Sequence, residues 1–187
     1  MITNTLAAQT HPFYSIGHST RTQEEFIALL LQNGVTALAD VRTMPRSRAN
    51  PQFNMDELEN ILPAAGIKYF RMEALAGFRK KRRDLDPAVN GYWQNQSFHN
   101  YADYALTPEF EAGLLALIEL GKTETCAFMC AEAVWWRCHR RIIADYLLTA
   151  GARVFHIIDE KPPKPAERNP AATPVEGGGL VYPAEGE

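Results

Sequence analysis

Short, nearly continuous apolar segments alternate along this chain with segments of helical periodicity, and this alternation limits the folds open to it. The strand candidates are residues 13–16, 35–41, 67–72, 125–129 and 153–158. Strands that alternate with helices form a mostly parallel sheet with helices on both faces. The sequence therefore predicts an α/β fold built on a five-stranded, mostly parallel sheet.

Capping patterns mark where the helices of this fold begin. Thr22 with Glu25 three residues later forms a capping-box pattern, and Asn54 with Glu57 forms another. Thr107 followed by Pro108 is typical of an N-cap and a first helical residue. A further helix is predicted over residues 136–150.

The length of 187 residues suits one domain. We expect residues 13–159 to form this domain, after a flexible N-terminus over residues 1–12. Residues 160–187 are rich in Pro and Gly, and such a segment buries little apolar surface. We therefore expect a disordered C-terminal tail.

Composition excludes some classes of partner and indicates a compartment. The formal net charge is −3, so nucleic-acid binding would require a local basic patch. No apolar run approaches the ~20 residues of a membrane span, and we expect no membrane partner. Cys126, Cys130 and Cys138 are three cysteines close together, which favours reduced thiols and a cytoplasmic location. The sequence leaves the oligomeric state and any cofactor open.

Polar side chains follow the first, second and fourth predicted strands, which end at one edge of a parallel sheet. Ligands of open α/β sheets bind at this edge, and the guanidinium group of Arg matches phosphate and carboxylate geometry. We therefore predict an anion-binding pocket there, with ligand-binding residues His18, Ser19, Arg42, Arg46, Ser47, Arg137 and Arg140. Asp40 and Arg42 lie on one face of the second strand, where an internal ion pair is the simplest interpretation.

Three groups of residues carry a resemblance to a known family. They are Tyr14-Ser-Ile-Gly-His-Ser-Thr20, then Asp40-Val-Arg42 with Pro45-Arg46-Ser47, and Cys130-Ala-Glu132 with Cys138-His-Arg140. In order and spacing the chain resembles the domain-of-unknown-function 488 family over roughly residues 13–158. The resemblance implies a compact cytoplasmic α/β domain of bacterial type with a shared polar site. It implies no particular reaction.

The first functional hypothesis is binding of a phosphate-bearing ligand, such as a nucleotide or a nucleic-acid end. Arg42, Arg46 and Arg140 would neutralise the anion, and His18 with Ser19 would position it. Glu132 and His139 are the candidate catalytic groups for moving a proton.

The second hypothesis is a thiol-dependent enzyme with Cys130 as nucleophile and Cys138 as its resolving partner. The alternative is that Cys130 is a buried thiol that only packs. Cys130, Glu132, Cys138 and His139 also carry metal-binding groups, but their spacing is not typical of a zinc site. Adjacent residues on a helix also point in different directions, so the sequence predicts no metal.

The third hypothesis is a non-catalytic interaction module that uses the long segment over residues 73–100. Five consecutive basic residues, 79–83, precede several aromatic residues, and this mixture suits single-stranded nucleic acid. The alternative is a solvated loop whose aromatic side chains cover the core.

Overall fold

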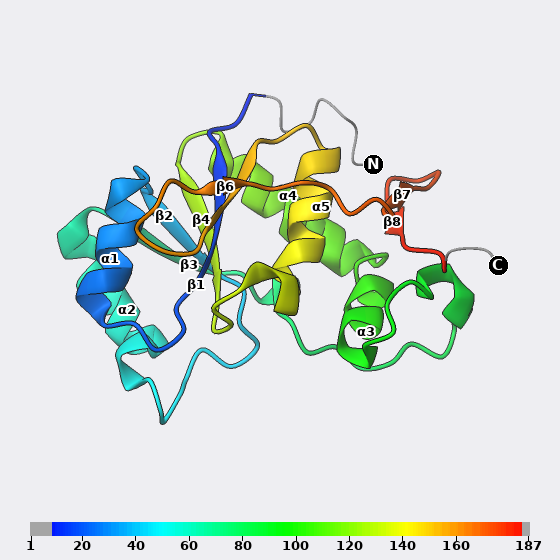
Figure 1. Ribbon diagram of the computed structural model, residues 1–187, viewed down its shortest axis with the longest axis horizontal. Coiled ribbons are helices and arrows are strands. Elements are labelled where there is room, and N and C mark those ends of the chain that lie inside the picture. The colour runs from blue at the N-terminus through cyan, green and yellow to red at the C-terminus, as the bar shows by residue number, and fades with distance from the viewer. Residues whose placement is uncertain (1–8, 185–187) are drawn as a thin grey trace.

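The computed structural model describes residues 9–184, and its main sheet lies between two layers of helices (Figure 1). The strand order is β3-β2-β4-β1-β5-β6. Five strands run parallel, and the short β6 is antiparallel to β5. The strands are β1 (Phe13–Gly17), β2 (Ala37–Asp40), β3 (Lys68–Arg71), β4 (Cys126–Cys130), β5 (Val154–Ile157) and β6 (Lys164–Pro165). The predicted α/β class is confirmed, with six strands in the main sheet rather than five.

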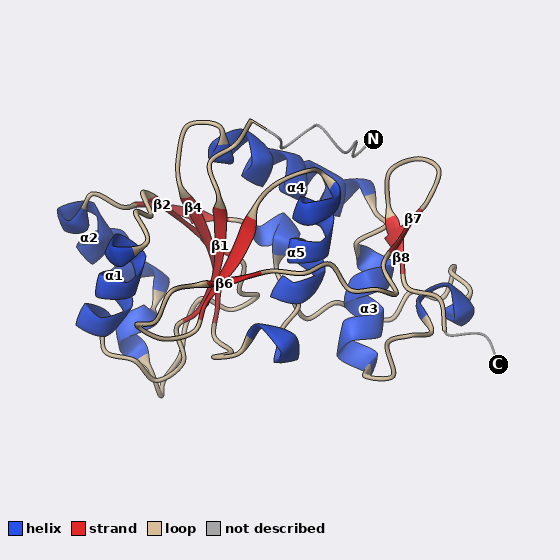
Figure 2. Ribbon diagram, turned by 45° about the horizontal axis from the view of Figure 1, so that its top comes forward, coloured by secondary structure: helices blue, strands red, loops and turns tan. Residues whose placement is uncertain are grey.

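The helices cover both faces of the sheet, as Figure 2 shows. One layer contains α1 (Gln23–Gln32) and α2 (Met55–Ile61). On the other side lie α4 (Pro108–Gly121) and α5 (Arg140–Thr149), and α3 (Gln96–Tyr104) lies beyond them. Because side chains alternate along a strand, β4 sends Phe128 into one apolar cluster and Met129 into the other.

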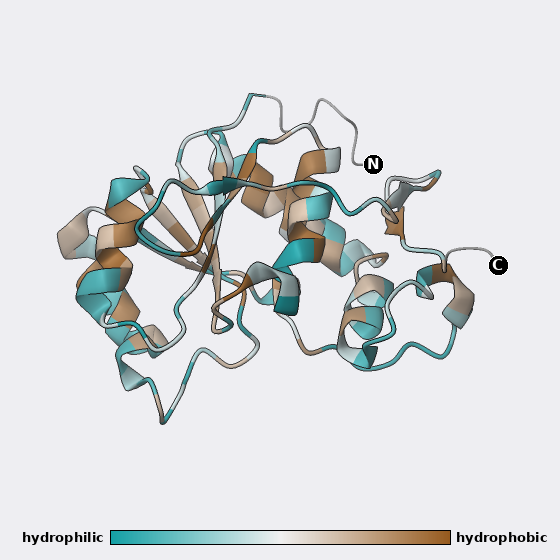
Figure 3. Ribbon diagram, viewed as in Figure 1, coloured by the Kyte–Doolittle hydropathy of each residue, from teal (hydrophilic) through white to brown (hydrophobic). Residues whose placement is uncertain are grey.

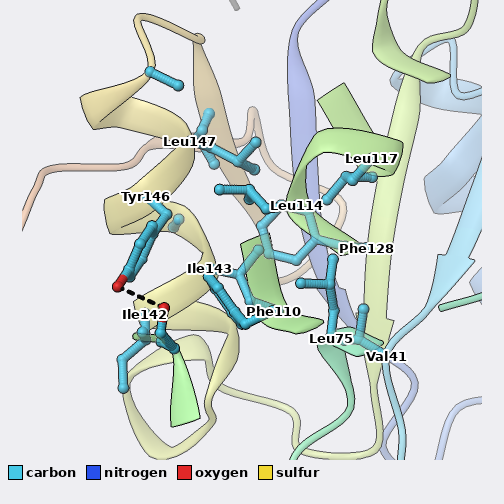
Figure 4. Close-up of a cluster of buried hydrophobic side chains, with 14 of the residues drawn as sticks. Val41, Leu75, Phe110, Leu114, Leu117, Phe128, Ile142, Ile143, Tyr146 and Leu147 are labelled. Carbon is cyan, nitrogen blue, oxygen red and sulfur yellow. Dashed lines mark hydrogen bonds between the residues drawn. The ribbon is translucent and has the colours of Figure 1, made fainter. Parts of the chain in front are cut away.

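The larger apolar cluster joins the sheet to α4 and α5. Figure 4 shows Phe128 of β4 near Leu114 of α4 and Ile143 of α5, all completely buried. The central strands carry mainly hydrophobic residues (Figure 3), as expected for a sheet covered on both faces. This burial fixes β1, β2 and β4 side by side and brings their carboxyl ends to one edge.

Two of the three predicted helix caps are confirmed. The Glu25 amide donates to Thr22 Oγ1 at 3.2 Å, and the Thr22 amide donates to Glu25 Oε2 at 2.9 Å. The Phe110 amide donates to Thr107 Oγ1 at 3.3 Å. The predicted capping box at Asn54 was wrong, because Asn54 Oδ1 instead accepts from the Ser47 amide at 2.7 Å. This bond holds the loop after β2 against the start of α2.

The helix predicted over residues 136–150 begins later than expected. A short 3₁₀ helix spans Trp135–Arg137, and Cys138 has an extended backbone before α5 begins at Arg140. The residue that precedes α5 is therefore His139, and the two cysteine-bearing segments approach each other ahead of the helix.

The prediction of a disordered tail was wrong for residues 160–184. β6 pairs with β5, and β7 (Thr173–Pro174) pairs with β8 (Leu180–Val181). Leu180 and Tyr182 are buried, and the Tyr182 hydroxyl donates to Asp145 Oδ2 at 2.9 Å. A few apolar residues anchor this segment although its average composition is polar, and the composition alone concealed them.

The remaining expectations concern the termini and membranes. Residues 1–8 of the predicted flexible N-terminus lie outside the described residues, and the His11 amide donates to the Gly121 carbonyl at 2.8 Å. Among residues 9–184, no helix has the length and apolar character needed to cross a bilayer.

Candidate functional site

Glu132 lines two of the pockets at the carboxyl edge of the main sheet. The first, called here the arginine pocket, has a volume of about 450 Å³. The second, the thiol pocket, has a volume of about 250 Å³. Residues lining the arginine pocket include His18, Ser19, Arg42, Arg46, Ser47, Asn50 and Glu132. The thiol pocket is lined by Cys130, Glu132, Arg137, Cys138 and His139 together with Phe78, Asn95, Ser97, Phe98 and Tyr101.

The parallel strands thus bring six of the predicted site residues to one hollow. They come from the loops after β1, β2 and β4, as strands that end at one edge require. Three other predicted residues, Cys130, Arg137 and His139, line the thiol pocket instead. Arg140 lines neither pocket.

Asp40 fixes the guanidinium group of Arg42 at the base of the arginine pocket. Arg42 Nε lies 2.9 Å and 3.1 Å from the two oxygens of Asp40, and Nη2 lies 2.5 Å from Oδ2. The Tyr69 hydroxyl donates to the same Oδ2 at 2.7 Å. Burial opposes the charge, but the hydrogen bonds and charge of Asp40 outweigh burial and raise the pKa of Arg42. The predicted Asp40–Arg42 pair is therefore confirmed.

His18 holds the other side of the Arg42 guanidinium. Its Nδ1 donates to the Ser19 carbonyl at 2.8 Å, which assigns the proton to Nδ1. Nε2 then accepts from Arg42 Nη1 at 3.3 Å, and the ring stacks on Phe53 with centroids 4.4 Å apart. Burial lowers the pKa of His18 to about 4, so the imidazole is neutral at pH 7.

The loops after β1 and β4 lie in close contact, and Gly17 permits this approach. A Cβ atom on Gly17 would lie 1.8 Å from the Glu132 carbonyl oxygen. The His18 amide donates to the Cys130 carbonyl at 2.9 Å, and the Ser19 amide donates to the Ala131 carbonyl at 3.0 Å. Ser19 also has a φ of 52°, which is unusual for a residue with a side chain. These two amides hold the loops together.

Arg46 and Glu132 carry opposite charges at the pocket surface. Both are exposed, and Arg46 makes no hydrogen bond or ion pair with any residue in the described part of the chain. Arg42 and Arg46 contribute two positive charges to the lining and Glu132 one negative charge, which gives +1. Asp40 behind Arg42 offsets that charge. The pocket thus offers both donors for an anion and a carboxylate acceptor.

The predicted ligand role of Arg140 requires correction. The side chain is only 1% exposed, because it lies on the face of α5 that packs on the sheet. Its Nη1 donates to Ser15 Oγ at 3.2 Å, and its Nη2 donates to the Glu132 carbonyl at 2.5 Å. Its Nε lies 3.3 Å from Cys138 Sγ. Arg140 therefore connects β1, the loop after β4 and Cys138, and it does not reach the arginine pocket.

The thiol pocket contains the half-buried Cys130 and the buried Cys138 next to His139. His139 Nε2 donates to the Val41 carbonyl at 3.0 Å, and its Nδ1 lies 3.5 Å from Cys138 Sγ. Burial raises the pKa of Cys138, but the Cys130 thiol, His139 and Arg140 together lower it well below the usual value. The hydrogen bond to Cys138, and then burial, raise the pKa of Cys130. Thiolate character therefore falls on Cys138 rather than on Cys130.

His139 does not share a pocket with Arg42, although Glu132 lines both pockets. His139 lines only the thiol pocket, whereas Arg42 lines only the arginine pocket.

Sequence reasoning missed Tyr69 and Asn50. Asn50 could have been predicted as a pocket residue, because it lies in the same loop as Arg46. The contact of Tyr69 with Asp40 could be predicted only if the pairing of β2 with β3 were known.

The aromatic residues of the segment 73–100 and its neighbourhood mainly cover the core. Trp93, Tyr101 and Tyr104 are buried. Arg79 lies over the Tyr104 ring, 3.8 Å from its centroid, and Phe78 is the exposed large hydrophobic side chain of this segment. For these three rings, the interpretation as a cover of the core is confirmed.

Comparison with known proteins supplies a family. A family model described as "Domain of unknown function DUF488" matches residues 22–147, well over half of the chain. Searches of curated proteins and of solved structures found no match. The matched region includes Arg42, Arg46 and Glu132, and it begins after His18 and Ser19. The order and spacing that suggested this family are thus supported by an independent match, and the chain belongs to the DUF488 family.

Proposed function

We propose that the arginine pocket binds a phosphate-bearing ligand, either a nucleotide or the end of a nucleic acid. The observation that carries this proposal is the set of free donors on Arg42. A guanidinium has five N–H groups. Asp40 occupies those of Nε and one on Nη2, and His18 occupies one on Nη1. One N–H on each Nη atom has no hydrogen-bond partner among residues 9–184, and such a pair can donate to two oxygens of one phosphate.

The arrangement around Arg42 supports an anion rather than a neutral ligand. The Arg42 side chain is only 4% exposed and its guanidinium is held on two sides, so binding would require little further ordering of the side chain. Arg46 adds an exposed cation that lines the same pocket and has no ion-pair partner among the described residues. Both arginines would then contact the phosphate.

Glu132 favours a ligand that carries hydroxyl groups next to its phosphate. An exposed carboxylate repels phosphate, but it accepts hydrogen bonds from hydroxyl groups. The pocket volume of about 450 Å³ is in the range of small-molecule sites. A phosphorylated sugar, as in a nucleotide, would satisfy both Arg46 and Glu132.

Calorimetric titration tests the proposal with nucleoside mono-, di- and triphosphates and a short 5′-phosphorylated oligonucleotide. We expect wild type to bind at least one of these probes, more weakly as salt is raised. Arg46→Ala should weaken that binding roughly tenfold to a hundredfold, as the loss of a charged hydrogen bond predicts. Arg48→Ala is the matched control, because Arg48 is exposed in the same loop but does not line the pocket.

Two results would count against a phosphate site. One is the absence of salt-sensitive binding of every probe by wild type. The other is equal affinity of the Arg46→Ala and Arg48→Ala variants.

The two other hypotheses remain predictions. The raised pKa of Cys130 does not favour a thiol-dependent enzyme with that residue as nucleophile. An interaction module would have to use Phe78 and the exposed Lys80 and Lys81, since the neighbouring rings of Trp93 and Tyr104 are buried.

A further inference from the structure

We propose that Cys130, Cys138 and His139 form a zinc-binding site whose fourth coordination position opens onto the thiol pocket. This site is separate from the arginine pocket, and the proposal does not depend on phosphate binding there. Two thiolates and an imidazole are ligands that suit Zn²⁺.

The three ligand atoms already lie close together. All of them are within 4.8 Å of one another, and Cys138 Sγ lies 3.5 Å from His139 Nδ1. Around a tetrahedral zinc, with its usual bond lengths, such atoms are separated by about 3.5–3.8 Å. Cys138 Sγ and His139 Nδ1 therefore already have the required spacing. The distances from these atoms to Cys130 Sγ, which are at most 4.8 Å, need to shorten only slightly.

The backbone explains why two adjacent residues can serve as ligands here. Cys138 has φ −134° and ψ 147°, an extended conformation, and His139 precedes the first turn of α5. The expectation that no metal binds depended on the atypical spacing and also on both residues lying within a helix, where neighbouring side chains diverge. The observed conformation removes that premise.

The surroundings of His139 have the pattern found around zinc-bound imidazoles. Its Nε2 donates to the Val41 carbonyl at 3.0 Å, which leaves Nδ1 as the atom with a free lone pair in the neutral ring. A backbone carbonyl in this position commonly orients a metal-bound histidine. A Cβ atom on Gly77 would lie 2.6 Å from Nδ1, so glycine at this position keeps space beside the ligand atom.

The charges around the cluster favour a bound divalent cation. Glu132 and Arg137 both line the same pocket, and their opposite charges offset each other. The buried Arg140, whose Nε lies 3.3 Å from Cys138 Sγ, offsets the charge of only one of the two thiolates, so a cation is needed to compensate the other. Because the cysteines and Arg140 are largely buried, an uncompensated thiolate would cost more there than at the surface.

The open fourth position follows from the pocket itself. The cluster lies at the wall of a cavity of about 250 Å³ whose other polar lining residues are Glu132, Arg137, Asn95 and Ser97. Three protein ligands with an open position are typical of zinc sites that bind water or a substrate, whereas structural zinc sites are closed by four.

The test uses the full chain with its thiols reduced and Co²⁺ as a spectroscopic probe. We expect one equivalent of Co²⁺ to bind, with a thiolate-to-cobalt charge-transfer band and the strong visible bands of a tetrahedral ion. Zn²⁺ should displace it, and should protect Cys130 from alkylation in a mass-spectrometric assay.

Single substitutions identify the ligands. Cys130→Ala, Cys138→Ala and His139→Ala should each weaken zinc binding by at least about tenfold, since even the loss of a supporting residue costs that much. Cys126→Ala is the matched control, because Cys126 is a buried thiol of the same strand outside the cluster. The zinc affinity of Cys126→Ala should equal that of wild type.

Three results would overturn the zinc site. The first is no stoichiometric metal binding by wild type after its three thiols are shown to be reduced. The second is unchanged binding in the Cys130→Ala and Cys138→Ala variants. The third is Zn²⁺-independent alkylation of Cys130, which needs no variant and so does not depend on their folding. None of these results bears on nucleotide binding at Arg46.

Discussion

Arg42 Nη1 lies 3.3 Å from His18 Nε2, and this contact joins the loops that follow β1 and β2. It depends on a neutral imidazole, because a protonated His18 would place a donor against a donor. Asp40 holds the opposite side of the same guanidinium. The direction of Arg42, and with it the chemistry of the arginine pocket, is therefore set by one ion pair and one neutral histidine.

Replacement of His18 by Gln should reduce the acid sensitivity of the fold. The folded-state pKa of His18, about 4, is below the usual histidine value of 6.5, so the unfolded chain binds more protons between these values. Stability is therefore lost as pH falls from about 6.5 toward 4, by up to about 3 kcal/mol. Urea unfolding at several pH values, with wild type and His18→Gln compared at each, measures this difference.

Comparison of wild type with His18→Gln separates the contribution of His18 to the pH dependence of stability from the contributions of two other groups. Burial lowers the pKa of His156 to about 3, which acts in the same direction, and burial raises that of Asp145 to about 6, which acts in the opposite direction. Because His156 and Asp145 are present in both wild type and His18→Gln, their contributions cancel in the comparison. Identical pH profiles for wild type and His18→Gln would show that His18 is not held neutral by the fold.

Asp40→Asn should destabilise the protein by about 3–5 kcal/mol, because it leaves the buried Arg42 without its counter-charge. Tyr69→Phe removes only one hydrogen bond to Asp40, and we expect a smaller loss of roughly 2 kcal/mol. Free energies of unfolding from urea titrations at neutral pH provide the comparison. A larger effect of Tyr69→Phe than of Asp40→Asn would contradict the assigned role of the ion pair.

Gly17→Ala should lower stability by about 3 kcal/mol or more, because its methyl group would overlap the Glu132 carbonyl 1.8 Å away. Gly91→Ala is the control, since the nearest atom to its added methyl is 3.2 Å away and its φ is −63°. Thermal unfolding of both variants measures the difference. Equal stabilities would mean that the loops after β1 and β4 are not in the close contact described.

Removal of residues 161–187 should destabilise the domain by several kcal/mol, because buried Leu180 and Tyr182 are lost from the larger core. Tyr182→Phe, which loses only the hydrogen bond to Asp145, should cost about 1 kcal/mol. The urea midpoint of each protein provides the measurement. A truncated chain as stable as wild type would restore the original expectation of a disordered tail.

Local patterns were sufficient where structure depends on neighbours in sequence. The Thr22 capping box and the strand runs such as residues 125–129 needed only local geometry. The grouping of His18, Arg42 and Glu132 at one pocket followed from the rule that parallel strands end at the same edge. Local patterning and one topological rule thus placed most of the arginine pocket.

Features that depend on contacts distant in sequence were not predictable. The Asn54 side chain accepts from the Ser47 amide rather than capping its helix. The Arg140 guanidinium donates to Ser15 Oγ and to the Glu132 carbonyl, and these bonds hold it in the interior. The order of the C-terminal segment depends on Asp145 and Asn90, which bind Tyr182. Composition and periodicity carry no information about such partners.

A crystal structure of the protein soaked with the nucleotide that binds it best is the most direct test of the proposed function. We expect a phosphate group within hydrogen-bonding distance of both Nη atoms of Arg42 and of the Arg46 guanidinium. A phosphate bound elsewhere, with Arg42 contacting only Asp40 and His18, would contradict the proposal.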